Sequence, residues 1–269
     1  MFILSYNCHM LSRNSNLLKK NNLEFEKHPF DHIVIDNFFD IDTAENLLGE
    51  FPNYDTDIWH EYKNAIELKK TCNDWNKFNT LTYSVFHYLN SDTFLNILKR
   101  VFKFDSLYSD MGLNGGGLHI HGSGGKLNPH LDYSVHPKLR LQRKLNLIVY
   151  LNKDWKEEYG GQFGMWSASE QNKPETLIKE ILPIFNRAVL FDTTQNSWHG
   201  LSREVKACKD IFRKSIATYY LCDLPDDADR RGKALFHPTK EQEKDEEVLE
   251  LIKKRADILT ASHVYKKKK

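Results

Sequence analysis

The sequence predicts a protein of the α+β class with a mainly β core, built as an antiparallel sandwich or barrel with flanking helices. Three observations lead to this fold class. After Asp110, short β-branched runs alternate with glycine-rich turns, without long helices between them. Before residue 105, helical and strand patterns are mixed. Beyond Pro225 the chain becomes charged and contains one segment with the apolar spacing of an amphipathic helix.

The N-terminal third is expected to contain one strand and two helices. Residues 1–27 are polar and rich in Lys and Asn, which predicts a flexible lead-in. Residues 30–35 are β-branched and end at an Asp-Asn turn signal, so a strand is predicted there. Residues 42–45 fit a capping box, and apolar residues then recur at helical spacing until Pro52. A second helix is predicted over 91–102.

The remaining elements are the strands of the core and a C-terminal helix. Strands are predicted at 144–151, 188–191 and 215–221, with glycine clusters marking turns between the β-rich runs. Residues 239–242 fit another capping box, and residues of 248–259 share the apolar face of a surface helix. The segment 226–269 is therefore expected to be a charged helical extension that ends in a solvated lysine tail.

Composition excludes several classes of protein. Lys and Arg number 38 and Asp and Glu 37, so the net charge of +1 argues against a nucleic-acid partner. No run approaches the ~18 apolar residues of a membrane span, and the N-terminus lacks a signal-peptide pattern. The cysteines form no CxxC pair and are expected to be reduced thiols; they are Cys8, Cys72, Cys208 and Cys222. We expect a soluble, cytoplasmic protein without a membrane partner; the sequence carries no signal of its oligomeric state.

The segment Asn128-Pro-His130-Leu-Asp132 is the main candidate for chemistry. On a strand, residues i and i+2 share a face, so His130 and Asp132 can reach one metal ion. A distant histidine would complete a facial triad of the kind that binds non-haem Fe(II). His199, which follows the apolar run 188–191, is the best candidate for this third ligand. The alternative is a surface histidine and a turn aspartate that bind no metal.

Arg213 opens the strand-like run that follows His199 and is the candidate anion site. An arginine deep in a barrel needs an anionic partner, and its planar fork matches a carboxylate. Ser215 lies on the same strand face and can donate a second hydrogen bond. A dicarboxylic acid bound by iron at one end and by Arg213 at the other would complete the site. The alternative for Arg213 is an ion pair with a protein carboxylate.

These motifs, taken in chain order, resemble those of the prolyl 4-hydroxylase-like 2-oxoglutarate/Fe(II) dioxygenases. The Tyr-Leu-Asn-Lys-Asp-Trp stretch at 150–155 is especially similar to the oxygen-sensing prolyl hydroxylases, and Gly160-Gly161 follows it. The resemblance covers residues 110–222 or so, and 35–39 also resembles the superfamily's lead-in. It implies a double-stranded β-helix, which is a cupin-like jelly roll. The dioxygenase domain would then span 28–225, with its jelly-roll core from about residue 110.

The resemblance also implies roles for individual residues. His130, Asp132 and His199 would bind Fe(II), and Arg213 with Ser215 would bind the C5 carboxylate of 2-oxoglutarate. Tyr150 matches a tyrosine that hydrogen-bonds this co-substrate in the oxygen-sensing relatives. His121 lies near a position where those relatives carry another tyrosine, so this chain departs from the pattern there. The implied reaction uses O₂, hydroxylates a C–H bond and decarboxylates 2-oxoglutarate to succinate, with ascorbate as a further candidate cofactor.

The substrate is left open by the sequence. A prolyl residue in a peptide would need an open groove beside the iron, whereas a small molecule or carbohydrate precursor would need a closed pocket. That pocket would be lined by the loop 112–125 and Trp166. A third hypothesis is a non-oxidative, cupin-like domain that binds a metal or ligand. It predicts no affinity for 2-oxoglutarate and no need for Arg213.

Several further residues have two interpretations. Trp166 and Trp198 flank the expected mouth, where they either stack on a substrate or pack in the core or rim. Arg140, Arg143 and Lys144 either border the substrate entrance, which would favour an anionic substrate, or form a solvated strand edge. The histidines after residue 118 suggest a second metal site, although hydrogen-bonded or exposed side chains are the simpler expectation; they are His119, His121, His130 and His136.

Overall fold

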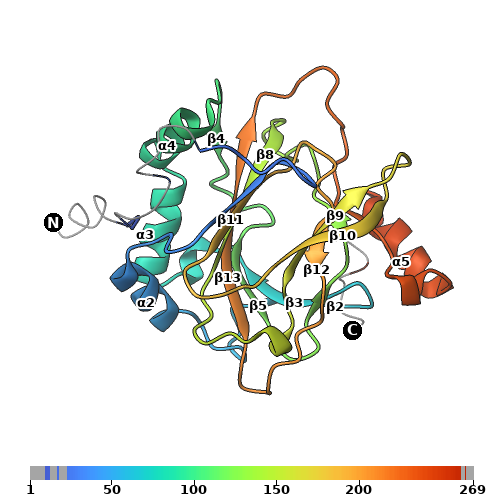
Figure 1. Cartoon of the computed structure of the whole chain (residues 1–269), viewed down its shortest axis with the longest axis horizontal. Coiled ribbons are helices and arrows are strands. Elements are labelled where there is room, and N and C mark those ends of the chain that lie inside the picture. The colour runs from blue at the N-terminus through green and yellow to red at the C-terminus, as the bar shows by residue number, and fades with distance from the viewer. Residues whose placement is uncertain (1–9, 13–16, 18–22, 262–263, 265–269) are drawn as a thin grey trace.

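The strands of the computed structural model form two antiparallel sheets (Figure 1). The structure describes residues 10–12, 17, 23–261 and 264. The larger sheet runs in the order β1 (His32–Ile35), β11 (Ala188–Asp192), β8 (Gln142–Tyr150), β13 (Arg213–Cys222), β5 (Gly117–His121), β3 (Glu67–Cys72) and β2 (His60–Lys63). Two short strands attach to it, β4 (Tyr108–Ser109) to β13 and β6 (Lys126–Leu127) to β3.

The smaller sheet carries the segment that contains the candidate metal ligands. Its order is β10 (Pro174–Ile181), β9 (Phe163–Ala168), β12 (His199–Leu201), β7 (His130–Leu131) and β14 (Leu235–Phe236). From β7 onward the chain passes back and forth between the sheets, because β8, β11 and β13 belong to the larger one. This winding is that of a double-stranded β-helix, so the predicted jelly roll is confirmed.

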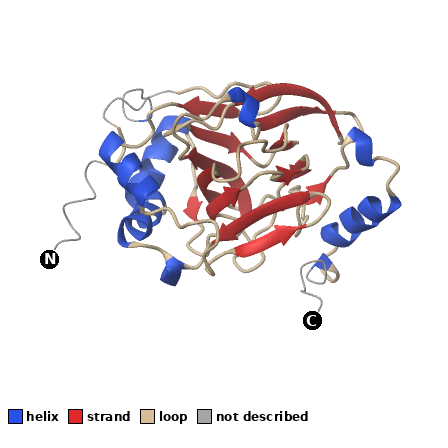
Figure 2. Cartoon of the chain, turned by 90° about the horizontal axis from the view of Figure 1, so that it is seen from below, coloured by secondary structure: helices blue, strands red, loops and turns tan. Residues whose placement is uncertain are grey.

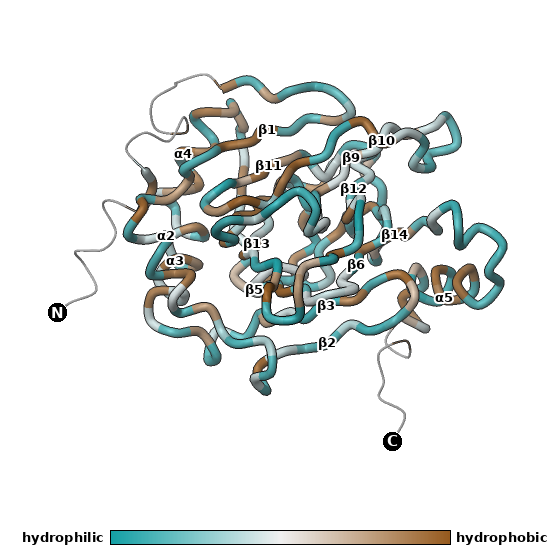
Figure 3. Tube along the Cα trace, turned by 60° about the horizontal axis from the view of Figure 1, so that its bottom comes forward, coloured by the Kyte–Doolittle hydropathy of each residue, from teal (hydrophilic) through white to brown (hydrophobic). Residues whose placement is uncertain are grey.

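Helices cover the outer face of the larger sheet. α2 (Ile41–Gly49), α3 (Thr80–Leu89) and α4 (Asp92–Phe102) lie together on one side of the molecule, whereas α5 (Glu246–Ala256) lies at the opposite end (Figures 1 and 2). Side chains from the three N-terminal helices and the larger sheet form the main hydrophobic cluster. In Figure 3 the edge strand β2 is drawn mostly in hydrophilic colours, which agrees with its exposed, charged sequence. Single 3₁₀ turns occur at η1 (Trp75–Lys77), η2 (Glu157–Tyr159) and η3 (Lys240–Gln242).

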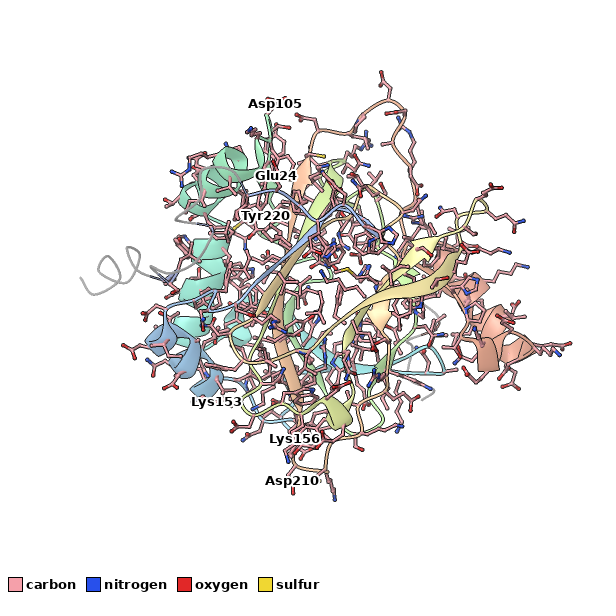
Figure 4. The ribbon with its side chains drawn as sticks, viewed as in Figure 1. Glu24, Asp105, Lys153, Lys156, Asp210 and Tyr220 are labelled. Carbon is pink, nitrogen blue, oxygen red and sulfur yellow. The ribbon has the colours of Figure 1, made fainter. Side chains whose placement is uncertain are left out.

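The strand period of two separates the helix layer from the interior of the jelly roll. On β13, Ile216 and Tyr220 belong to the helix-side cluster, and the Tyr220 hydroxyl donates to the Leu89 carbonyl of α3 (Figure 4). Ser215 and Tyr219, which immediately precede these two residues, therefore face the interior. Because this alternation is shared by paired residues of neighbouring strands, one face of the larger sheet becomes the wall of a common cavity.

The pairing of β8 with β13 contains one irregularity. Tyr220 pairs with Leu145, but the next residue, Leu221, pairs with Arg143, so Lys144 is an extra residue on β8. Such a β-bulge re-aims the side chains on one side of it. Without it, Arg143 would share the helix-side face of Leu145; with it, Arg143 faces the interior.

Details of the predicted helices require correction. The N-cap of α2 is Asp40, whose carboxylate accepts from the Thr43 amide, so the predicted capping box at 42–45 is wrong. The capping box at 239–242 is confirmed, but it caps η3, and α5 is capped instead by Asp245. α5 ends at Ala256, which leaves Leu259 exposed rather than on the helix face. The predicted helix over 91–102 is confirmed, with Ser91 as its cap.

Part of the predicted lead-in is attached to the domain. Leu11 forms a β-bridge with Phe39, and Met10 and Leu11 are buried in the main hydrophobic cluster. Residues 1–9, which include Cys8, residues 13–16 and 18–22, and the lysine tail at 266–269 lie outside the described residues. Among the described cysteines, Cys72, Cys208 and Cys222 form no disulfide. A search of the described helices finds none with the length and apolar character of a membrane span.

Candidate metal and co-substrate site

The three predicted ligands converge in the structure. β7 and β12 pair so that His130 and His199 lie opposite one another, with ring centroids 4.3 Å apart. Asp132 follows β7 by one residue; its carboxylate oxygens lie 3.9 Å from Nε2 of His130 and 3.8 Å from Nε2 of His199. All three groups are buried, and among the described residues they form the sole such His/Cys/Asp/Glu cluster, with one ligand atom of each within 4.8 Å of the others.

Backbone carbonyls fix the orientation of both imidazoles. Nδ1 of His130 lies 3.0 Å from the Asn128 carbonyl oxygen, and Nδ1 of His199 lies 2.8 Å from that of Ser197. Because a carbonyl oxygen can only accept, each Nδ1 must carry the proton, and each Nε2 keeps its lone pair. Both lone pairs are on the side of Asp132, as metal-binding histidines require.

The electrostatic environment keeps the histidines neutral and the aspartate ionised. Burial, reinforced by His199, lowers the pKa of His130 well below its ordinary value, and burial also lowers the pKa of His199. Burial opposes ionisation of Asp132, but neighbouring donors, foremost the Arg143 guanidinium, outweigh it and lower the pKa of this carboxyl. Two neutral imidazoles and one carboxylate are the donor set of non-haem Fe(II) sites, so the residues present fit such an ion.

Arg213 is a buried cation without an anionic partner among the described residues. Its Nε donates to the Gly161 carbonyl at 2.7 Å, and no described carboxylate forms an ion pair with it. The predicted alternative, an ion pair within the protein, is therefore not observed. Burial lowers the pKa of this guanidinium, because its interaction with Tyr150 offsets only part of the cost of desolvation. Gly161 has a φ of +70°, and a Cβ there would lie 2.9 Å from Cδ of Arg213, so glycine permits the close approach of this loop to the Arg213 side chain.

The other predicted co-substrate residues surround Arg213. Ser215 pairs with Tyr150 on β8, and Arg213 pairs with His121 on β5, so the four side chains share the interior face. The Tyr150 ring lies 4.9 Å from the Arg213 guanidinium, and its buried hydroxyl has no acceptor among the described residues. Both ring nitrogens of His121 are also buried without a hydrogen-bond partner. Unsatisfied buried groups of this kind indicate a place for a polar ligand.

A cavity of about 400 Å³ joins the metal cluster to Arg213. This volume lies within the roughly 300–1,000 Å³ of small-molecule sites. Its inner part is lined by His121, Arg213 and Ser215, and its outer part by the β2–β3 hairpin and the C-terminal segment 232–261. The loop residues Asn114–Gly116 also line it, as predicted for a closed pocket, but Trp166 does not.

The C-terminal extension contributes directly to this site. Strand β14 pairs with β7, and the Phe236 ring stacks on His130 with centroids 5.0 Å apart. Arg231 donates to the backbone carbonyl of Asp132 at 3.1 Å. Asn128 lies two residues before His130, and its side-chain amide donates to Gln242 at 2.6 Å. The extension therefore buttresses the candidate ligands, a role that no sequence pattern indicated.

Both predicted interpretations of Arg143 are wrong. It is 2% exposed and neither borders the entrance nor forms a solvated edge; Nη1 lies 3.3 Å from the Asp132 carboxylate. Lys144 pairs with Asp192 and Arg140 is exposed, so the predicted basic entrance does not form. Trp198 is buried, which favours the packing interpretation. His136 pairs with Asp110 rather than joining a second metal cluster.

The fold and the site together define a class: a jelly-roll protein with a buried two-histidine, one-carboxylate cluster. Residues 116–221 match the family model described as the 2OG-Fe(II) oxygenase superfamily. The chain is 26% identical over 78 residues to prolyl 3-hydroxylase OGFOD1 of Mus musculus, and 26% over 97 residues to that of Xenopus laevis. These matches cover 29% and 36% of this chain but only 14% and 18% of the relatives.

A solved structure shares the fold. A prolyl hydroxylase from Trichoplax adhaerens, in complex with a hypoxia-inducible-factor peptide fragment, superposes with a TM-score of 0.51 at 20% identity. The match covers 71% of this chain and 83% of that chain, and at this identity it supports the fold alone. A Pseudomonas putida prolyl-4-hydroxylase gives a TM-score of 0.48 at 16% identity, over 72% of this chain and 93% of that one.

Proposed function

We propose that this protein is a 2-oxoglutarate- and Fe(II)-dependent dioxygenase that hydroxylates a C–H bond. His130, Asp132 and His199 would hold the ferrous ion, and Arg213, Ser215, Tyr150 and His121 would bind 2-oxoglutarate. When bound, the ion with O₂ and 2-oxoglutarate supplies the oxidising chemistry, with succinate as co-product. The chain itself keeps both Nε2 lone pairs available, orients the oxo-acid through its far carboxylate and limits the access of water.

The observation that carries this proposal is the buried guanidinium of Arg213, which lines the cavity of the metal cluster and has no carboxylate partner among the described residues. An isolated buried charge is costly, so the site is built for an anion that arrives with a ligand. A cupin-like domain that only holds a metal would have no use for this charge. The orphaned hydroxyl of Tyr150 and the nearby Ser215 provide further donors to a carboxylate at the same place.

For the substrate we propose a prolyl residue of a peptide as the first candidate. The names of the mouse and frog relatives, prolyl 3-hydroxylases, favour it. A small molecule is the second candidate, because the C-terminal segment walls the outer part of the cavity and restricts the space beside the metal cluster.

The test is an assay of succinate formation from 2-oxoglutarate with Fe(II) and O₂, with and without ascorbate. Wild-type protein should release succinate slowly alone and faster with a true substrate, whose product gains one oxygen atom by mass spectrometry. Prolyl peptides and small hydroxylatable molecules form the two arms of the panel. His130→Ala and Asp132→Ala should abolish succinate release.

Arg203→Met is the matched control, because Arg203 is 47% exposed and pairs with Glu180 on the surface. It should turn over like wild type. Succinate release that persists in Asp132→Ala would contradict the assignment of the metal ligands. A wild-type protein that binds metal but not 2-oxoglutarate would contradict the proposed reaction and favour the non-oxidative cupin-like hypothesis.

A further inference from the structure

The two carboxylate oxygens of Asp132 have unequal environments. Oδ1 accepts from the Tyr219 hydroxyl at 3.2 Å, lies 3.3 Å from Nη1 of Arg143 and is 3.9 Å from Nε2 of His130. Oδ2 has one long contact, 3.4 Å from the Asn146 amide, and lies 3.8 Å from Nε2 of His199. Oδ1 is therefore occupied by donors, whereas Oδ2 keeps lone pairs available for a cation.

The Arg143 guanidinium that meets Oδ1 is held on both faces and along its edge. Its central carbon lies 3.4 Å from the ring centroid of Tyr133 and 3.5 Å from that of Tyr219. Nη2 donates to the Asn114 carbonyl. Gly115, with a φ of +79°, closes the space behind, since a Cβ there would lie 2.8 Å from Nη2. A planar cation between two rings can move little in any direction.

The β-bulge at Lys144 brings Arg143 to this place. It turns Arg143 away from the helix layer, where Leu145 points, and into the interior beside Tyr219. Bulges next to functional sites commonly re-aim one side chain in this way. The irregularity, the two tyrosines and the glycine thus act on a single guanidinium, which in turn contacts one oxygen of one candidate ligand.

We propose that Arg143 is a positioning residue that, clamped between Tyr133 and Tyr219, holds Asp132 so that Oδ2 alone binds the metal. This inference rests on the proposed function, because it assumes a metal ion at the His130–Asp132–His199 cluster. A positive charge this near repels a metal ion, so a role based on charge alone would weaken binding. Fixing the ligand acts in the opposite direction, and loss of such supporting contacts typically costs about 10- to 100-fold in metal affinity.

A pair of tyrosine variants separates positioning from structure. Tyr219→Phe keeps the stacked ring but removes the donor to Oδ1. Tyr220→Phe makes the same chemical change at the next residue of the strand, whose hydroxyl donates instead to the Leu89 carbonyl on the helix side of the sheet. The readout is the affinity for Mn(II) and Co(II), measured by titration calorimetry without oxygen or 2-oxoglutarate, together with the visible spectrum of the Co(II) protein. Tyr219→Phe should bind roughly tenfold more weakly and shift the spectrum, and Tyr220→Phe should match wild type within about twofold.

Arg143→Lys and Arg143→Met test the guanidinium itself, with thermal unfolding of the metal-free proteins as a check on folding. Lysine keeps the charge but cannot bridge Oδ1 and the Asn114 carbonyl, so both variants should lose at least as much affinity as Tyr219→Phe. Equal affinities for Tyr219→Phe, Tyr220→Phe and wild type, or tighter binding by Arg143→Met, would overturn the inference while leaving the metal site intact. A wild-type protein that binds neither ion would instead overturn the proposed function.

Discussion

Arg213 shows how one residue can serve function at the expense of stability. It is buried, donates to a backbone carbonyl and has no carboxylate partner among the described residues. In the protein without a bound anion, its contacts with neutral groups therefore offset only part of the desolvation cost of the charge. Because the guanidinium has no carboxylate partner, a ligand carboxylate can form a bidentate, charge-assisted pair with it, which is stronger than a neutral hydrogen bond. The two effects can be separated by substitution.

Arg213→Met should leave the metal-free protein as stable as wild type or more stable, because it removes an unpaired buried charge. Its affinity for 2-oxoglutarate should fall by at least roughly thirtyfold, since truncating one member of a buried charge pair costs about 2–5 kcal/mol. Thermal unfolding measures the first effect and calorimetric titration of 2-oxoglutarate in the presence of Mn(II) the second. Unchanged affinity would show that Arg213 does not bind the co-substrate.

His119 should make the protein sensitive to acid. It lines the cavity, and burial together with Lys69 lowers its pKa to about 3. The unfolded chain binds a proton near the ordinary value of about 6.5, so the native state is favoured above that pH. Its contribution is lost progressively as the pH falls from about 6.5 towards about 3.

Urea unfolding in the presence of a chelator is the measurement for this prediction. The free energy of unfolding should be lower at pH 5 than at pH 7, and the difference should shrink in His119→Asn. A difference that is the same in wild type and His119→Asn would show that other groups set the acid sensitivity.

Strand β14 is only two residues long but contacts both a candidate metal ligand and a hydrophobic cluster. Phe236 is buried, stacks on His130 and joins a small apolar cluster with Val248 of α5. Because the aromatic ring supports one face of a candidate ligand, a change here should affect both folding and metal binding.

Phe236→Ala should lower the free energy of unfolding by about 3–5 kcal/mol through the cavity it creates. It should also weaken metal binding, because the His130 ring loses its support. Val248→Ala thins the same cluster without touching His130 and is the matched control. It should lower stability alone; equal effects on Mn(II) affinity in both variants would argue against a specific role of Phe236.

The strands show which features of the fold and of the candidate site can be predicted from sequence. The period of two was enough to place His130 with Asp132, and Arg213 with Ser215, on shared faces, because strand geometry is local. The direction of Arg143 was not predictable, because the bulge that turns it is defined by the register against β13, a strand about 70 residues later in the chain. α3 and the β2–β3 hairpin were missed for a related reason. Their sequences are mixed in polarity, and one face of the hairpin borders a cavity rather than the core.

For the whole molecule, the candidate site joins the two sheets. His130 and His199 lie on the smaller sheet, whereas Arg213 lies on the larger one. A co-substrate bound to the metal at one end and to Arg213 at the other would therefore connect both layers of the jelly roll. Ligands that bind only the native state raise its stability by mass action, by about 2.7 kcal/mol at a hundredfold excess over Kd.

Mn(II) should therefore raise the thermal midpoint, and 2-oxoglutarate should raise it further when Mn(II) is present. Without metal, 2-oxoglutarate should have a smaller effect, because one of its two anchors is missing. Arg213→Met should keep the shift due to Mn(II) and lose the additional one. Differential scanning calorimetry in the absence of oxygen measures all three. A shift by 2-oxoglutarate that is independent of the metal would contradict a shared site.

The bulge at Lys144 affects how the role of a residue can be inferred from its position in an alignment. One extra residue on β8 decides whether an arginine contacts a candidate metal-binding carboxylate or faces the apolar helix layer. Two homologues could therefore carry arginine at equivalent alignment columns and still differ in metal chemistry, if one of them lacks the insertion. Chain length between Asp132 and Tyr150, and not residue identity alone, is what a comparison of such enzymes should examine first.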